Sequence, residues 1–289
     1  MILALTSACS PAATWTGRAG PVVLATTTFL ADIARNVAGQ RLPVDSLLSP
    51  GADPHAFQAT PADVTRISAS TVLIANGAGY EGFIQSLLEN AGGERIVIEA
   101  SAGLHVRESP EAEHGIDPHF WLDPNNVVAY AANIRDGLIQ ADPQGKLVYE
   151  ANAAAYAAAL QELDSWIVDQ VSTVAPERRL LVTNHDALGY FADRYGFQIV
   201  GTVLPSVSSD ASVSAQDLSE VIQQIRANNV QAIFLDEVEN PNLVSQIAAE
   251  AGAVVVADLH VESLTDGPPA ATYINMMKHN VTRIVEALK

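Results

Sequence analysis

Three histidines and one aspartate have the side chains and the spacing to bind a metal ion together. The candidates are His55 and His119, which each follow an Asp-Pro pair, His185, which follows an asparagine, and Asp258. Three imidazoles and one carboxylate form a complete donor set for a tetrahedral divalent ion such as zinc. Because the four candidates are spread almost evenly along the chain, such a site requires a fold in which distant loops converge.

The elements that would position these residues alternate between short apolar runs and helical stretches. This alternation predicts an α/β fold with two similar lobes, each a mostly parallel sheet covered by helices. We expect strands at 22–26, 44–48, 72–75, 96–98, 180–183, 199–203, 232–235 and 254–256. We expect helices at 29–37, 61–67, 186–195, 214–228 and 241–251, one starting near residue 124, and one from 270 to the C-terminus.

An alanine-rich segment separates the two halves and favours one long, stiff helix. It divides the chain into a signal remnant and tether (1–20), an N-terminal lobe (21–142), a connecting helix (143–175) and a C-terminal lobe (176–289). An ordinary helix packed on one lobe is the alternative for the connector. Ligands of open parallel sheets bind beyond the carboxyl ends of the strands, so we expect the site in the cleft between the lobes.

Nearby aspartates add to the candidate site, whereas the remaining histidines do not. Asp53, Asp117, Asp123 and Asp186 could accept the second imidazole N–H of a metal ligand, or could start turns and cap helices. His105 and His114 lie in an acidic, polar segment that is predicted to be a solvated loop, with loose ion capture as the alternative. His260 and His279 are expected to be structural or exposed.

Composition and charge limit the classes of function. The chain has 289 residues, 48% of them hydrophobic and 17% charged, and a net charge of −18. This is a globular composition, and its acidity argues against a nucleic-acid partner, whose phosphates require basic residues. The single cysteine, Cys9, excludes an intrachain disulfide.

The residues around Cys9 suggest how the protein attaches to a membrane. An apolar run and small residues precede Cys9, as at the end of a bacterial lipoprotein signal peptide, which would make Cys9 the acylated first residue. An incidental cysteine in a frayed N-terminus is the alternative. No later segment has the ~18–20 apolar residues of a membrane span. A lipid anchor at Cys9 would therefore be the only membrane attachment.

Several motifs resemble those of one family, the TroA-like (cluster A-I) proteins that deliver zinc or manganese to ABC importers. The resemblance runs from about Val22 to the C-terminus. Its motifs are Gly-Ala-Asp-Pro-His at 51–55 with Thr-Pro at 60–61, Asn-Gly-Ala-Gly-Tyr-Glu at 76–81, Asp-Pro-His-Phe-Trp-Leu-Asp-Pro at 117–124, His-Asp-Ala-Leu-Gly-Tyr-Phe at 185–191 and Ile-Phe-Leu-Asp-Glu at 233–237.

The resemblance implies a binding protein with metal buried between two lobes that one long rigid helix joins. It implies ligands at His55, His119, His185 and Asp258. Manganese-type members typically carry glutamate where this chain has His185, so zinc is the expected cargo, with manganese or iron as the alternative. The implied partner is the membrane permease of a metal ABC transporter. The implied protein is an extracytoplasmic monomer, either periplasmic or lipid-anchored at the outer face of the cell membrane.

Two further classes of function remain as alternatives. A zinc hydrolase would keep one metal position open for water, whereas Asp258 would close it here, and no His-Glu-x-x-His motif occurs. A surface adhesin on the same scaffold has no residue in its favour. We therefore expect a protein that is not an enzyme.

Overall fold

Two parallel four-stranded sheets form the framework of the protein, as the alternating pattern predicts. The computed structural model describes residues 20–109, 115–204, 206, 214–236 and 241–289. The first sheet has the order β2-β1-β3-β4 and the second has the order β6-β5-β7-β8, so both halves repeat one topology. Their strands are β1 (Val23–Ala25), β2 (Val44–Ser46), β3 (Val72–Ala75), β4 (Ile96–Glu99), β5 (Leu180–Thr183), β6 (Gln198–Thr202), β7 (Ala232–Asp236) and β8 (Val254–Leu259).

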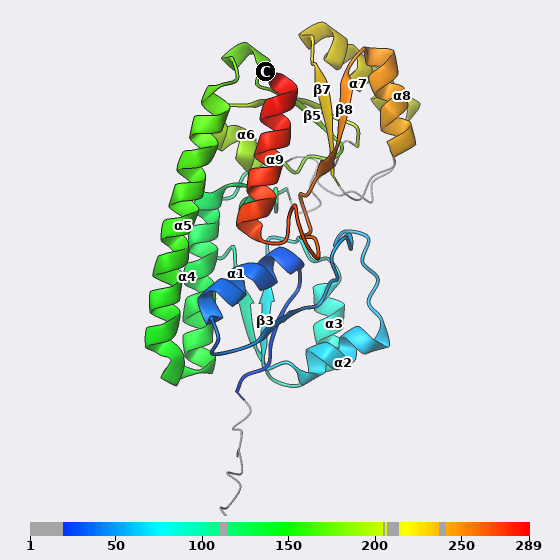
Figure 1. Ribbon diagram of the computed structural model, residues 1–289. Coiled ribbons are helices and arrows are strands. Elements are labelled where there is room, and N and C mark those ends of the chain that lie inside the picture. Colours follow the sequence, from blue (N-terminus) through cyan, green and yellow to red (C-terminus); the bar gives the residue numbers. More distant parts are fainter. Residues whose placement is uncertain (1–19, 110–114, 205, 207–213, 237–240) are drawn as a thin grey trace, which may run out of the picture.

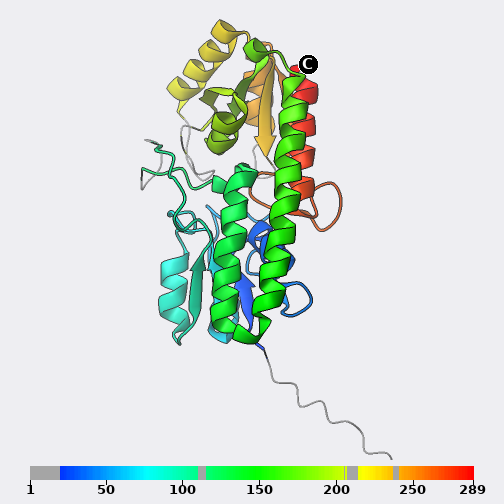
Figure 2. The ribbon, with the colours of Figure 1, turned by 90° about the vertical axis from the view of Figure 1, so that its left-hand side faces the viewer.

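Helices cover both sheets (Figures 1 and 2). They are α1 (Thr28–Ala38), α2 (Pro61–Ala69), α3 (Ile84–Ala91), α4 (Pro124–Ala141), α5 (Lys146–Ser172), α6 (Gly189–Tyr195), α7 (Ala215–Asn228), α8 (Pro241–Ala251) and α9 (Tyr273–Leu288). Helix α2 begins with the capping box of Thr60 and Asp63 and has Pro61 in its first turn, which are the signals that predict its start. Helix α3 has no counterpart in the sequence-based prediction.

Helix α5 runs along both lobes and joins them (Figure 1). It has 27 residues, and a short 3-10 turn at Pro143–Gly145 precedes it, so the predicted helix is present within residues 143–175. Its buried side chains recur every three or four residues, which is the spacing of one helical face. This face packs on α1 and α4 in the N-terminal lobe and on α9 in the C-terminal half. The division of the chain into domains at these boundaries stays a prediction.

The hydrophobic core continues from one lobe to the other. One large cluster of buried side chains includes residues of α1, α4, α5, α6 and α9, together with strands of both sheets. Smaller clusters fill the outer sides of the lobes, under α7 and α8 in one and under α2 and α3 in the other. Because close-packed side chains resist shear, this shared core favours a fixed relation between the lobes.

The segment after β8 leaves its own lobe and packs on the N-terminal lobe. The indole N–H of Trp121 donates to the carbonyl of Val261 at 2.8 Å, and the backbone N–H of Leu264 donates to Thr28 Oγ1 at 2.8 Å. The hydroxyl of Tyr273 then donates to the carbonyl of Trp121 at 2.6 Å. The loop that follows the last strand is therefore fixed by residues from the first half of the chain.

Among the described residues, no helix combines the length and the apolar character that crossing a bilayer requires. The proposed anchor residue Cys9 lies outside the described residues, as does His114.

Candidate metal centre

His55 lies on the loop between β2 and α2. Its backbone N–H donates to Asp53 Oδ1 at 2.8 Å, so the carboxylate closes the Asp-Pro-His turn. Its ring packs edge-on against Tyr80, with the ring centroids 5.2 Å apart. The His55 side chain is 8% exposed, and this makes it the most solvent-accessible of the three candidate histidines.

His119 is completely buried just before the 3-10 turn Phe120–Leu122. Asp117 Oδ1 lies 2.8 Å from His119 Nδ1 and also accepts the backbone N–H of His119 at 3.0 Å. The first contact favours a proton on Nδ1, which makes Nε2 the nitrogen of this ring that would bind a metal. This confirms the predicted role of Asp117 as the acceptor for a candidate ligand.

His185 follows β5 at the point where the strand order of the second sheet reverses. Its Nδ1 lies 3.5 Å from Asp236 Oδ2, and Asp236 is the last residue of β7. Both residues thus lie at the topological switch point, where ligands of open α/β sheets bind. Asp236 belongs to the Ile-Phe-Leu-Asp-Glu motif at 233–237, but the motif alone predicts no role for this residue.

Glu262 brings the three histidines together. Its Oε1 lies 2.9 Å from Nε2 of His55, 3.3 Å from Nε2 of His119 and 3.2 Å from Nε2 of His185. If one ligand atom is taken from each of the four side chains, all four atoms lie within 4.8 Å of one another. The ligands of a tetrahedral zinc ion lie about 3.4 Å from one another, given metal–ligand distances near 2.1 Å. The three contacts of Glu262 Oε1 come close to this spacing.

The structure places Asp258 away from this group, which corrects the predicted fourth ligand. Asp258 lies within β8, its side chain is 48% exposed, and its Oδ1 accepts from Arg283 Nε at 2.8 Å. The apolar run predicts a strand that ends at Val256, whereas β8 continues to Leu259. Both His260 and Glu262 lie beyond this strand end, and of the two only Glu262 reaches the three histidines.

Charge complementarity holds the metal-free group together. Burial disfavours the charged forms of His55, His119 and His185, but the Glu262 carboxylate, with that of Asp117 for His119, outweighs burial and raises each pKa. Burial likewise disfavours the Glu262 carboxylate, yet the three imidazoles lower its pKa well below the usual range. Glu262 Oε2 is buried and has no hydrogen-bond partner among the described residues. A buried carboxylate oxygen without a donor is available to a cation.

The other predicted acceptors have different roles. Asp123 caps α4, where its carboxylate accepts the N–H of Asn125 at 2.8 Å, which confirms the capping alternative. Asp186 Oδ2 lies 3.5 Å from Arg107. His260 and His279 lie beside each other outside the candidate centre, with ring centroids 5.4 Å apart and ring planes tilted by 43°. His105 is exposed and lies outside it as well.

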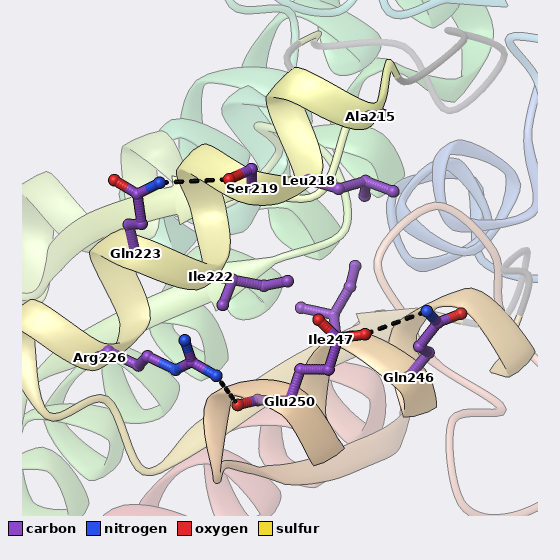
Figure 3. Close-up of a pocket in the computed structure, with 9 residues that line it drawn as sticks. All are labelled: Ala215, Leu218, Ser219, Ile222, Gln223, Arg226, Gln246, Ile247 and Glu250. Atoms are coloured by element: carbon purple, nitrogen blue, oxygen red, sulfur yellow. Dashed lines mark hydrogen bonds between the residues drawn. The ribbon is translucent and has the colours of Figure 1, made fainter.

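A separate groove lies on the outer side of the C-terminal lobe, away from the buried candidate centre. It has a volume of about 320 Å³ and lies between α7 and α8, where Leu218, Ile222 and Ile247 face one another (Figure 3). None of the four candidate ligands lines it. Its lining lacks any group of histidines and carboxylates, so it does not offer the donor set of a metal site.

The fold and the centre define a class: two-lobed proteins with a buried His₃Glu site for a divalent ion at the lobe junction. The profile of the family described as "Zinc-uptake complex component A periplasmic" matches residues 23–287. The manganese-binding lipoprotein MntA of Halalkalibacterium halodurans is 34% identical over 100% of this chain and 96% of its own length. The iron-binding protein YfeA of Yersinia pestis is 32% identical over 91% and 85%, respectively.

A solved structure agrees with these sequence relatives. The periplasmic zinc-binding protein TroA of Treponema pallidum superposes with a TM-score of 0.87 and 29% identity, covering 93% of this chain and 99% of TroA. The chain therefore belongs to the ZnuA family of TroA-like substrate-binding proteins of metal ABC transporters. It is an extracytoplasmic binding protein, periplasmic or lipid-anchored, and not an enzyme. This confirms the predicted family, fold class and localisation.

Proposed function

We propose that the protein captures one zinc ion between its lobes, with His55, His119, His185 and Glu262 as the ligands, and passes it to the permease of an ABC importer. The observation that carries this proposal is the convergence of three imidazole Nε2 atoms on one Glu262 oxygen. Four ligands fill the tetrahedral positions and leave none for a catalytic water, which favours capture over hydrolysis.

Zinc is favoured by the nitrogen-rich donor set. Imidazole suits zinc, whereas carboxylate and carbonyl oxygens suit manganese, and zinc also exceeds manganese in the general order of divalent affinities. The named relatives include a manganese-binding, an iron-binding and a zinc-binding protein, so membership in the family does not by itself select the metal.

Manganese is the second candidate, and Glu262 Oε2 is the observation in its favour. If both oxygens of this carboxylate bound the ion, the coordination number would rise to five. Zinc in closed protein sites prefers four ligands, whereas manganese accepts more oxygen-rich coordination. The coordination number of the bound ion therefore separates the two candidates.

The test is a competition between metals for the purified protein at neutral pH. We expect one bound ion per chain and tighter binding of zinc than of manganese, measured by native mass spectrometry and titration with a chelator. X-ray absorption of the zinc form should give four nitrogen or oxygen neighbours. Tighter manganese binding would overturn the zinc assignment, and the Glu262→Gln variant tests whether this carboxylate belongs to the site.

Anchoring and delivery complete the proposal. Cys9 would tether the protein to the outer face of the membrane through acyl chains, and the protein would act as a monomer. Incorporation of a labelled fatty acid that is lost in the Cys9→Ala variant is the test of the anchor, and a Cys9→Ala variant that keeps the label would disprove it.

A further inference from the structure

One arginine contacts carboxylates from both lobes beside the candidate centre. Arg107, on the segment between β4 and Phe120, lies 3.2 Å from Asp117 Oδ2, 3.5 Å from Asp186 Oδ2 and 3.3 Å from Asp193 Oδ2. Asp117 belongs to the N-terminal lobe, whereas Asp186 and Asp193 belong to the loop after β5 and to α6 of the C-terminal lobe. These four residues are called the Arg107 cluster below.

The Arg107 cluster is connected to one candidate ligand in each lobe. Asp117 uses its other oxygen, Oδ1, to bind the ring and the backbone of His119. Asp186 directly follows His185 in the chain. The guanidinium thus lies between the residue that orients one histidine and the neighbour of another, and its planar fork suits several carboxylates at once.

The backbone around the start of α6 is shaped for this contact. A Cβ atom on Gly189 would lie 2.4 Å from one guanidinium nitrogen of Arg107 and 2.5 Å from Asp117 Oδ2, so only glycine allows the lobes to approach this closely. Next to it, the Tyr190 hydroxyl accepts the backbone N–H of Arg107 at 2.8 Å and donates to the carbonyl of Asp117 at 3.1 Å.

The Arg107 cluster is partly exposed to solvent. It borders a surface cavity of about 720 Å³ that Arg107, Tyr190 and Asp193 help to line. The side chain of Arg107 is 26% exposed, and that of Asp193 is 71% exposed, whereas that of Asp117 is fully buried. Loss of Arg107 would leave three carboxylates facing one another across the lobe junction, and their repulsion would weaken this contact between the lobes.

We propose that Arg107 is a positioning residue that latches the C-terminal lobe, and with it His185, against the other three ligands, so that metal release requires the Arg107 cluster to break. This inference rests on the proposed function, because it assigns the control of release to a residue outside the ligand set. It predicts that changes at Arg107 act mainly on the rate at which bound metal leaves.

The experiment measures zinc release from the full-length protein into excess chelator by stopped flow. In Arg107→Gln, we expect release at least tenfold faster than in the unsubstituted protein, with a far-UV spectrum that is unchanged. Arg107→Lys should restore part of the slow release, because it keeps the charge but not the fork. The matched control is Arg135→Gln, which loses an exposed ion pair to Asp136 within α4 and should release zinc at the normal rate.

Gly189→Ala provides an independent test of the same contact. Its methyl group would displace the guanidinium of Arg107, although the arginine itself is not substituted. Fast release in this variant supports the latch even if Arg107→Gln does not fold. Release within twofold of normal in both variants would overturn the latch and leave the proposed function intact. Failure of the unsubstituted protein to bind one zinc ion would instead overturn the proposed function itself.

Discussion

In the N-terminal lobe, His119 lies 2.8 Å from a fully buried carboxylate that also accepts its backbone N–H, whereas in the C-terminal lobe His185 lies 3.5 Å from Asp236. The two sheets share one topology, but only His185 lies just after a strand, because His119 immediately precedes the 3-10 turn Phe120–Leu122. Two similar lobes therefore carry candidate ligands whose side chains are held by contacts of different length. The difference indicates that the C-terminal lobe holds its ligand more loosely.

The contacts around Glu262 add to this difference between the lobes. Glu262 follows the last strand of the second sheet, but its neighbour Ser263 accepts the backbone N–H of Gly51 at 2.8 Å and lies 3.3 Å from Thr28 Oγ1. The N-terminal lobe therefore fixes the surroundings of His55, His119 and Glu262. Glu262 is still joined to β8, but His185 depends most directly on the position of the C-terminal lobe, so small movements of that lobe would act first on this ligand.

The largest expected loss of zinc affinity comes from removing a candidate ligand. Glu262 and Asp258 are acidic residues close together in the chain, so their alanine variants make a matched pair. We expect Glu262→Ala to weaken zinc binding by more than the roughly 100-fold that loss of an outer partner costs. Asp258→Ala should leave the affinity unchanged, because Asp258 pairs with Arg283 outside the centre. Isothermal titration of both variants is the measurement, and a weaker zinc affinity in Asp258→Ala than in Glu262→Ala would refute the assignment.

This pair also shows what the sequence could and could not provide. The Asp-Pro-His motifs and the position after β5 are local features, so His55, His119 and His185 could be found without a structure. The fourth candidate depended on where β8 ends, and strand ends are the least certain part of such predictions. No local pattern places Glu262 beside residues that precede it by up to 207 positions. That contact arises because the segment after β8 packs on Trp121 and Thr28.

Proton competition is expected to have the next largest effect. The pKa of each candidate histidine is raised above its ordinary value because Glu262 outweighs burial, and the metal must displace these protons. Zinc affinity should therefore fall steeply as the pH drops, with the decline starting above the ordinary histidine pKa of ~6.5. Titrations from pH 8 to pH 5 test this, and a flat profile would contradict ligation by the three imidazoles.

The same shifts set the sign for stability. A histidine with a raised pKa stabilises the metal-free fold below its unfolded pKa, and this contribution is lost as the pH rises through the folded pKa. The lowered pKa of Glu262 stabilises the fold above its ordinary value of 4.5, and this contribution is lost only as the pH falls through its folded pKa. The rise in melting temperature on adding zinc should therefore increase with pH, as calorimetry of both forms can measure.

A smaller loss of zinc affinity is expected when the carboxylates that contact the ligand histidines, those of Asp117 and Asp236, are replaced. Asp117→Asn should weaken zinc binding by roughly 10–100-fold, because it removes the acceptor that orients His119. Asp236→Asn should cost less, because its contact with His185 is longer. Competition with a zinc dye can rank the two variants, and a greater loss in Asp236→Asn would reverse the proposed order of firmness between the lobes.

The smallest expected effect tests whether the N-terminal lobe really holds Glu262. Ser263→Ala removes the oxygen that accepts the Gly51 N–H, and this should lower the free energy of unfolding by about 1–2 kcal/mol. It should also weaken zinc binding, by less than Asp117→Asn does, because the carboxylate itself remains. Ser165→Ala, on the exposed surface of α5, is the control and should change neither quantity. If Ser263→Ala lowers stability but leaves the zinc affinity intact, Glu262 keeps its place without the N-terminal lobe, and the asymmetry between the lobes then rests on Asp117 alone.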